Sequence, residues 1–313
     1  MTHRGHRAVA LVGATASGKS SLAHALVRDG DVEEGEILAV DAMTVYRGMD
    51  LATAKPTPNE RREVRYHLLD LVEASEEFTV AQYQVAARQA ARGVWDRDGA
   101  VLYVGGAGLY GRVVLDELEI PGQFRDVRRD LETRVLDGLA ALYEELRLLD
   151  PVAASRMEPT NVRRVVRALE VTIGSGRPFS SFGEGLLSYG PARVVQVGLE
   201  VDVERLDARI ESRFRAWMDE GLLEEVVALA SAPGGLSRTA SQAVGYKELL
   251  RHVHEGVALE TCVLDAITRS RRLARRPRSW FTRDPRIEWF ADADSARRRL
   301  GEVLNGPDGF VRD

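Results

Sequence analysis

The feature that most constrains this chain is the octapeptide at residues 13–20, which matches the phosphate-binding loop pattern G-x-x-x-x-G-K-[ST] at every fixed position. In such a loop the glycines let backbone N–H groups turn toward an anion, the lysine adds a positive charge, and the final hydroxyl is available to a magnesium ion. The pattern therefore predicts a phosphate or pyrophosphate site rather than an ordinary Gly/Ser turn. Its residues are Gly13, Ala14, Thr15, Ala16, Ser17, Gly18, Lys19 and Ser20.

The residues on both sides of this loop support the prediction. Residues 8–12 form a short apolar run of the kind found in buried strands. Residues 20–27 are compatible with a helix, because Leu22 and Leu26 are four positions apart. The loop is therefore expected between a strand and the N-terminus of a helix, where anions bind readily.

Size and composition indicate a globular protein. A chain of 313 residues can hold one large α/β domain with an insertion, or two domains. No apolar run is long enough to span a membrane, and residues 1–7 lack the apolar stretch of a signal peptide, so we expect a cytoplasmic protein without membrane contact. The single cysteine, Cys262, excludes an intrachain disulfide framework, and its neighbours predict a buried helical thiol.

The charge distribution leaves a nucleic-acid partner open. A net charge of −5 argues mildly against one. Residues 269–283, however, contain seven arginines and no acidic residue, so a local basic face is compatible with the sequence.

Asp41 is the first candidate catalytic residue. It follows a predicted buried strand at residues 36–40, and open α/β sheets bind their ligands at the carboxyl ends of the strands. The alternative is that Asp41 only caps a helix at residues 42–46. The polar segment that follows, residues 46–56, has no amphipathic period and is predicted to be a functional loop.

A second glycine-rich turn follows the next predicted strand. Residues 100–104 are apolar and lead into residues 105–110, a turn that lets backbone approach a ligand, although this signal is weak alone. A helix is expected before it, at residues 79–95. The lone His67 has no second histidine or cysteine at ligand spacing, which favours a structural or substrate-contacting role over metal binding.

The pattern becomes helical after residue 121. We expect an α/β fold with a P-loop NTPase-like parallel sheet, divided into a first core part (1–120), a helical insertion (121–190) and a second core part (191–313). In the insertion, Asn161 is predicted to cap a helix at residues 162–173 whose arginines form at least a solvated face. Later helices are expected at 203–220, 222–230, 241–254, 257–276 and 295–304, with strands at 193–199 and 286–290 and with Pro277 ending the fourth helix.

Most chains with this loop bind ATP or GTP, so a small-molecule kinase is the first functional hypothesis. A Walker B acid should then end a buried strand, but the strand at 100–104 ends in glycines. The only acid at a strand end is Asp41 on the neighbouring strand, where it could act as the base that deprotonates an acceptor.

Beyond the loop, the whole chain from about residue 8 to 290 resembles the tRNA dimethylallyltransferases. These enzymes attach a five-carbon isoprenoid to N6 of the adenine next to the anticodon. The likeness is carried, in this order, by residues 46–50, 53–56, 67–70, 105–110, 164–171, 213–214, 221–222, 225–226, 242–248, 274–276 and 280–281.

The resemblance implies that the loop, together with Ser21, holds the pyrophosphate of dimethylallyl diphosphate, with Mg²⁺ at Ser20. It implies catalytic roles for Asp41, Lys19 and Arg213. It further implies a base flipped out of the anticodon loop, an insertion that contacts tRNA, and a monomer. The implied acceptor contacts are Asp41, Ala42, Met43, Thr44, Ala107, Arg128, Arg163, Arg164, Arg167, Gln242, Gly245, Tyr246, Lys247, Arg275, Arg276 and Trp280.

Four positions depart from the family pattern, and all lie on the acceptor side. Ala42 stands where a serine usually follows the catalytic aspartate, and Thr44 stands at a frequent glutamine. Ala107 replaces the usual threonine or serine of the glycine-rich turn, and Pro277 replaces the glutamine of the usual Arg-Gln pair. A hydroxyl lost from a polar site leaves its partner unpaired, at about 1 to 3 kcal/mol. The departures keep three alternatives open besides a slower tRNA enzyme. These are the same donor with a small acceptor, such as an adenine nucleotide or another aromatic nitrogen compound, an inactive RNA-binding paralogue, and a small-molecule kinase.

Overall fold

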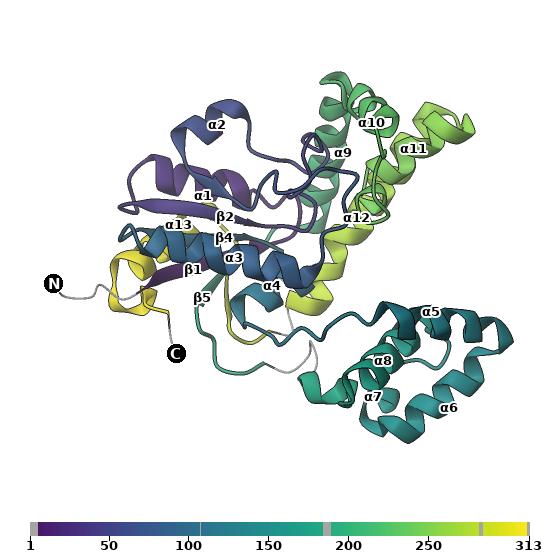
Figure 1. The fold of residues 1–313 in the computed structure, drawn as a ribbon. Coiled ribbons are helices and arrows are strands. Elements are labelled where there is room, and N and C mark those ends of the chain that lie inside the picture. The colour runs from purple at the N-terminus through teal and green to yellow at the C-terminus, as the bar shows by residue number, and fades with distance from the viewer. Residues whose placement is uncertain (1–5, 107, 184–188, 282–283, 312–313) are drawn as a thin grey trace. The chain divides into compact units, whose positions relative to one another are not determined.

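The computed structural model (Figure 1) describes residues 6–106, 108–183, 189–281 and 284–311, and gives only the backbone of residues 137 and 276–281. The chain forms two compact units. Unit 1 contains Met1–Glu117 and Tyr189–Asp313, and unit 2 contains Leu118–Ser188.

Unit 1 is built on a six-stranded sheet with the order β3-β2-β4-β1-β5-β6. Every described pairing between these strands is parallel, which confirms the predicted α/β class. Parallel strands present their carboxyl ends at one edge, so the residues after β1, β2 and β4 lie near one another. The strands are β1 (Arg7–Gly13), β2 (Gly35–Val40), β3 (Tyr66–His67), β4 (Ala100–Gly105), β5 (Val195–Leu199) and β6 (Ile287–Phe290).

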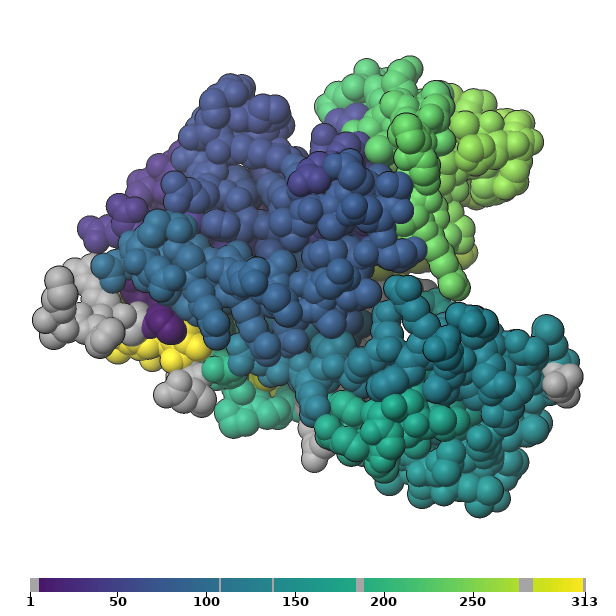
Figure 2. Space-filling model, viewed as in Figure 1, coloured from purple at the N-terminus to yellow at the C-terminus, as the bar shows by residue number. Residues whose placement is uncertain are grey.

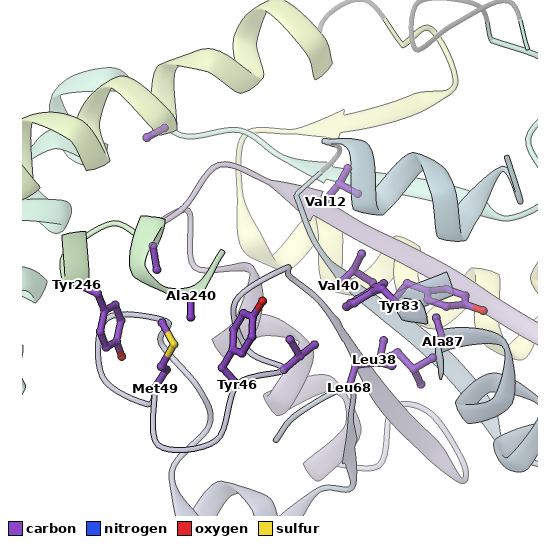
Figure 3. Packing of buried hydrophobic residues seen from close by; sticks show 14 of the residues in the cluster. Val12, Leu38, Val40, Tyr46, Met49, Leu68, Tyr83, Ala87, Ala240 and Tyr246 are labelled. Carbon is purple, nitrogen blue, oxygen red and sulfur yellow. The ribbon is translucent and has the colours of Figure 1, made fainter. Parts of the chain in front are cut away.

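Helices cover both faces of this sheet, because side chains of a strand alternate between the faces. On one face, Val9 and Leu11 of β1 join a buried cluster with α1 (Lys19–Arg28) and α13 (Ala293–Asn305). On the other face, Val12, Leu38 and Val40 belong to a cluster that includes Tyr83 and Ala87 of α3 (Val80–Trp95), as Figure 3 shows. The sheet edge that carries the phosphate-binding loop is therefore supported from both sides.

The remaining helices of unit 1 are α2 (Pro58–Glu63), α4 (Leu109–Leu115), α9 (Val203–Asp219), α10 (Leu222–Ser231), α11 (Tyr246–Glu255) and α12 (Leu259–Phe281). The predicted thiol Cys262 is buried in α12. No helix among the described residues is long and apolar enough to cross a membrane.

Three local predictions were wrong. No helix forms at residues 42–46, so the proposed capping role of Asp41 has no helix to cap. The helix expected from residue 241 is a short 3-10 turn, Ala240–Gln242, and α11 begins only after Gly245, whose φ of 93° interrupts the helix. The helix expected to end at Pro277, α12, continues to Phe281. Proline removes only one intrahelical hydrogen bond, and the preceding turns of α12 pack on α9 and α11, which holds the helix together.

Unit 2 is helical, with its own small core around Leu131, Leu142 and Leu169. The side chain of Asn161 caps α8 by accepting a hydrogen bond from the backbone N–H of Arg164 at 3.2 Å, as predicted. The helices are α5 (Arg125–Arg134), α6 (Leu139–Leu149), α7 (Pro151–Ser155) and α8 (Val162–Ser175), with 3-10 turns at Val135–Asp137 and Phe179–Phe182.

Candidate active site

The phosphate-binding loop connects β1 to α1, and its backbone has the shape of an anion cradle. Gly18 has a φ of 97°, and Ala16 has a φ of 62°, a left-handed conformation that is rare outside glycine and is typical of functional loops. No side chain caps α1 at Gly18, so the first N–H groups of the helix remain directed at a ligand. A Cβ on Gly13 would lie 3.0 Å from the carbonyl oxygen of Leu199, which explains the glycine there.

Lys19 is the cation of this loop. Its Nζ donates a hydrogen bond to the carbonyl oxygen of Ala14 at 3.2 Å. Burial of the ammonium group lowers the pKa of Lys19 from 10.5 to about 8, while the charge of Asp41 raises it and the charge of Arg213 lowers it. Lys19 therefore lies within electrostatic reach of both other residues expected to be catalytic.

Arg213 reaches the loop from α9. Its Nη2 donates to Oγ1 of Thr15 at 2.8 Å, and its guanidinium carbon lies 4.7 Å from the centre of the Trp217 ring. Arg209, one turn earlier, donates from Nη1 to the carbonyl oxygens of Ala16 at 3.4 Å and Ser17 at 3.3 Å. One face of α9 thus places two arginines against the loop.

Two buried donors in this site have no hydrogen-bond acceptor. Burial lowers the pKa of Arg213 to about 10, and its Nε is buried without a hydrogen-bond partner. The hydroxyl of Ser17 is also buried and unpaired. Since buried donors normally have partners, and since the two half-buried cations Lys19 and Arg213 repel each other, the arrangement fits an anionic ligand.

A divalent cation fits the same place if the ligand supplies most of its oxygens. Ser20 lies exposed at the first turn of α1. No cluster of three or more His, Cys, Asp or Glu side chains in the described part of the chain could hold a metal by itself. Mg²⁺ commonly binds through one or two protein oxygens together with phosphate oxygens and water, which is the set that Ser20 and a diphosphate provide.

Asp41 lies exposed at the carboxyl end of β2, two strands from the loop in the sheet order. Its Oδ1 accepts a hydrogen bond from the backbone N–H of Met43 at 2.7 Å, which forms a turn rather than a helix cap. Burial raises the pKa values of Tyr83 and Tyr110, and the charge of Asp41 raises both further. The two tyrosines, whose ring centres are 4.9 Å apart, therefore lie within electrostatic reach of Asp41.

Thr44 is buried and faces inward. Its hydroxyl lies 3.2 Å from the carbonyl oxygen of Asp41 and 3.3 Å from that of Leu68, and so ties the Asp41 turn to the segment after β3. Ala42 and Met43, between them, are half-buried. The hydroxyl of Thr44 is thus engaged within the protein.

The glycine-rich turn after β4 contains a glycine that the sheet requires. A Cβ on Gly105 would lie 2.1 Å from the carbonyl oxygen of Val40 on the adjacent strand. Ala107 lies outside the described residues. His67 forms a hydrogen bond with Glu36, at 2.5 Å between Nε2 and Oε2, within the protein.

The other residues expected to bind the acceptor in unit 1 lie around α11 and α12. Gln242 and Lys247 are exposed, whereas Gly245 and Tyr246 are buried. Arg275 pairs with Asp207. The side chains of Arg276 and Trp280 lie outside the described residues.

The expected acceptor arginines of unit 2 lie on α5 and α8. Arg163 and Arg164 are exposed, while Arg128 and Arg167 pair with the buried carboxylate of Glu170 at 3.2 and 2.8 Å. Glu170 also accepts a hydrogen bond from the backbone N–H of Phe124 at 2.9 Å. It therefore fixes the position of two of the four arginines.

Arg209 and Trp217 were not predicted as site residues from the sequence. Both are on the same face of α9 as Arg213, at a spacing of four residues, which is the signal that could have indicated them. That signal is weak, because nothing in the sequence tells which face of α9 meets a loop almost two hundred residues earlier.

Comparison with known proteins gives one consistent family. A family model described as IPP transferase matches residues 44–284. The chain is 43% identical over 305 residues to the tRNA dimethylallyltransferase of Nocardioides sp., covering 96% of this chain and 97% of that protein. It is 44% identical over 289 residues to the tRNA dimethylallyltransferase of Salinispora tropica, with 92% and 89% covered.

Solved structures of similar proteins agree with this family assignment. The tRNA isopentenylpyrophosphate transferase from Bacillus halodurans is 33% identical, with a TM-score of 0.69 and 96% of both chains covered. A eukaryotic dimethylallyltransferase acting on tRNA is 23% identical, with a TM-score of 0.75 and 96% of this chain and 79% of that chain covered, which indicates a shared fold.

Proposed function

This chain belongs to the IPP transferase family, and we propose that it transfers a dimethylallyl group from dimethylallyl diphosphate to N6 of an adenosine next to the anticodon in tRNA. One observation carries the proposal. The half-buried cations Lys19 and Arg213 converge on a complete phosphate-binding loop, and the carboxylate of Asp41 lies within electrostatic reach of Lys19. This pairing of an anion site with a base suits the transfer of a carbon group from a diphosphate.

The donor half of the reaction is the departure of pyrophosphate. The C–O bond between the allylic carbon and the diphosphate breaks, and negative charge grows on the leaving oxygen. The N–H groups of the loop, Lys19 and Arg213 stabilise that charge in a site already arranged for it. Arg209 holds the loop carbonyls and so helps to keep the cradle in shape.

Mg²⁺ is the cation we propose beside Ser20. When bound, it neutralises diphosphate charge and polarises the leaving oxygen. In that role Ser20 supplies one hydroxyl oxygen, and Lys19 remains the protein's own charge on the donor.

The acceptor half is the attack of N6 on the allylic carbon. The adenine amino group is a weak nucleophile, because its lone pair is delocalised into the ring. We assign Asp41 as the hydrogen-bond acceptor and base that takes the N6 proton as the C–N bond forms. Its Oδ1 is oriented by the N–H of Met43, which leaves Oδ2 as the atom that would receive the proton.

Recognition of tRNA is proposed for the exposed basic residues of both units. Arg163 and Arg164 on α8, and Lys247 on α11, are exposed and suited to phosphate contacts. The target base has to leave its stack to reach Asp41. We further propose a cytoplasmic monomer, in keeping with a tRNA substrate.

A small acceptor is the competing proposal, and one observation favours it. Ala42 carries no hydroxyl where the family pattern has a serine. The hydroxyl of Thr44, at a position where glutamine is frequent, lies against two backbone carbonyl oxygens, so neither side chain offers a polar group to a tRNA base. The donor would be the same.

The test is incubation of the protein with labelled dimethylallyl diphosphate, Mg²⁺ and either bulk tRNA or AMP. Label in tRNA alone supports the proposal. Label in AMP alone supports the small acceptor, and label in neither contradicts both.

A further inference from the structure

The segment between Asp41 and Pro56 has no regular secondary structure in its middle, yet it is well anchored. A loop of this length needs partners for its backbone groups if it is to hold one shape. On one side these partners come from the segment after β3: the N–H of Asp70 bonds to the carbonyl oxygen of Thr44 at 3.1 Å, and that of Leu71 bonds to Val45 at 2.7 Å. The other side is held by two charged side chains.

The first of these is Glu225 of α10. Its Oε2 accepts hydrogen bonds from the backbone N–H groups of Asp50 and Leu51, both at 3.2 Å, and its Oε1 lies 3.2 Å from the same N–H of Asp50. The hydroxyl of Tyr246, at the start of α11, donates to Oε1. One carboxylate therefore joins the loop to the first residue of α11.

The second is Lys55, whose side chain is only 1% exposed. Its Nζ donates to the carbonyl oxygen of Tyr46 at 2.6 Å, to Oδ1 of Asp50 at 2.7 Å and to Oδ1 of Asp70 at 2.5 Å. Asp50 is thus held twice, by its backbone through Glu225 and by its side chain through Lys55. The loop is fixed at Tyr46 and again at Asp50 and Leu51.

Packing brings the same segments together. Tyr246, Met49 and Tyr46 belong to one buried cluster (Figure 3). A Cβ on Gly245 would lie 3.0 Å from the Cβ of Ala52 and 3.2 Å from the ring of Phe214, so the loop lies directly against the turn before α11. In Figure 2 the purple surface of the loop meets the green surface of the α9–α11 region.

We propose that Glu225 is a positioning residue for the acceptor, because it sets the spacing between the loop that begins at Asp41 and the segment 242–247. Both segments are expected to contact the acceptor, so this inference rests on the proposed function. Glu225 itself contacts neither the phosphate-binding loop nor Asp41 in the described hydrogen bonds, and its effect is therefore on the acceptor side.

The test compares Glu225→Gln with Glu224→Gln, which alters the exposed neighbour on the same helix turn. A glutamine at 225 presents an NH₂ group where the carboxylate receives N–H and O–H donors, and one donor is left unpaired. We expect kcat/KM for tRNA to fall about 5- to 150-fold in Glu225→Gln. The affinity for dimethylallyl diphosphate should stay within about twofold of the parent, and Glu224→Gln should match the parent in both.

Tyr246→Phe removes only one hydroxyl and serves as a milder variant. If Tyr246 and Glu225 act through their shared hydrogen bond, the double variant should be no worse than Glu225→Gln alone.

Unchanged tRNA kinetics in Glu225→Gln would overturn the inference. So would a loss of donor affinity equal to the loss in kcat/KM together with a lower melting temperature, which would mean general destabilisation. If the parent protein transfers nothing to tRNA, the proposed function fails and the inference about Glu225 fails with it. If the parent is active, the kinetics of Glu225→Gln test the inference about Glu225 alone.

Discussion

Replacing Lys19 by methionine should stabilise the free protein while abolishing transfer. The chain has three lysines, Lys19, Lys55 and Lys247, and each has a different environment. Lys19 has a pKa lowered by burial and one carbonyl acceptor, Lys55 is buried with three acceptors, and Lys247 is exposed. The same substitution at the three positions therefore tests three different contributions to the free energy of unfolding.

The magnitude follows from the pKa of Lys19, which is about 8 in the folded protein and 10.5 in the unfolded chain. A group whose folded pKa is lowered is harder to charge in the folded state, so below pH 8 the charge of Lys19 destabilises the fold by up to about 3 kcal/mol. That penalty decreases as the pH rises from about 8 to 10.5 and is then gone. Lys19→Met should thus raise the melting temperature at pH 7 by several degrees, and the gain should fade toward pH 10.5.

Thermal unfolding of the ligand-free parent and the Lys19→Met variant between pH 6 and 10.5 measures this difference in melting temperature. Lys247→Met is the exposed control and should leave the melting temperature nearly unchanged. Lys55→Met should lower it, because the carbonyl oxygen of Tyr46 and the carboxylates of Asp50 and Asp70 lose a hydrogen-bond donor, at about 1 to 3 kcal/mol. A lower melting temperature for Lys19→Met at pH 7 would refute the reasoning, since Lys19 would then contribute to stability without an anion.

Three further substitutions test the site. Asp41→Asn keeps the turn to Met43 and should lower turnover about 10²- to 10⁴-fold with an unchanged melting temperature, and unchanged turnover would reject Asp41 as the base. Arg213→Ala should lower kcat/KM for the donor about 10²- to 10³-fold in steady-state assays, and a loss below tenfold would contradict its role on the diphosphate. Arg163→Ala should lower the slope of log affinity for tRNA against log salt concentration by up to about 0.9. The control Arg147→Ala removes an arginine that is paired with Glu144 and should leave this slope unchanged. Equal slopes for the two variants would argue against a phosphate contact at Arg163.

The donor side of this site could be predicted from sequence because its signals are local. The glycines of the loop, the apolar run of β1 and the amphipathic α1 follow one another in the chain, so their arrangement depends on short-range rules. Asp41 could be placed because a strand end in a parallel sheet defines an edge. The parallel sheet itself follows from buried strands that alternate with helices.

The acceptor side depends on long-range contacts that no local pattern contains. Glu225 bonds to Asp50, which is 175 positions away, and Arg209 bonds to the loop across 193 positions. The burial of Tyr246 likewise depends on the packing of three distant segments, so its role as a partner of Glu225 could not be derived from residues 242–248 alone. At Pro277 the local rule that proline ends a helix gave the wrong boundary, because the packing of the rest of α12 keeps the helix continuous.

The central claim is the transfer of a carbon group to one adenosine of tRNA, and a single-turnover assay with two transcripts tests it most directly. One transcript keeps the adenosine next to the anticodon, and the other has guanosine there. With labelled dimethylallyl diphosphate and Mg²⁺, we expect label only in the adenosine transcript, with one pyrophosphate released for each group transferred and no requirement for ATP. Equal labelling of both transcripts, or pyrophosphate release without label in either, would contradict it.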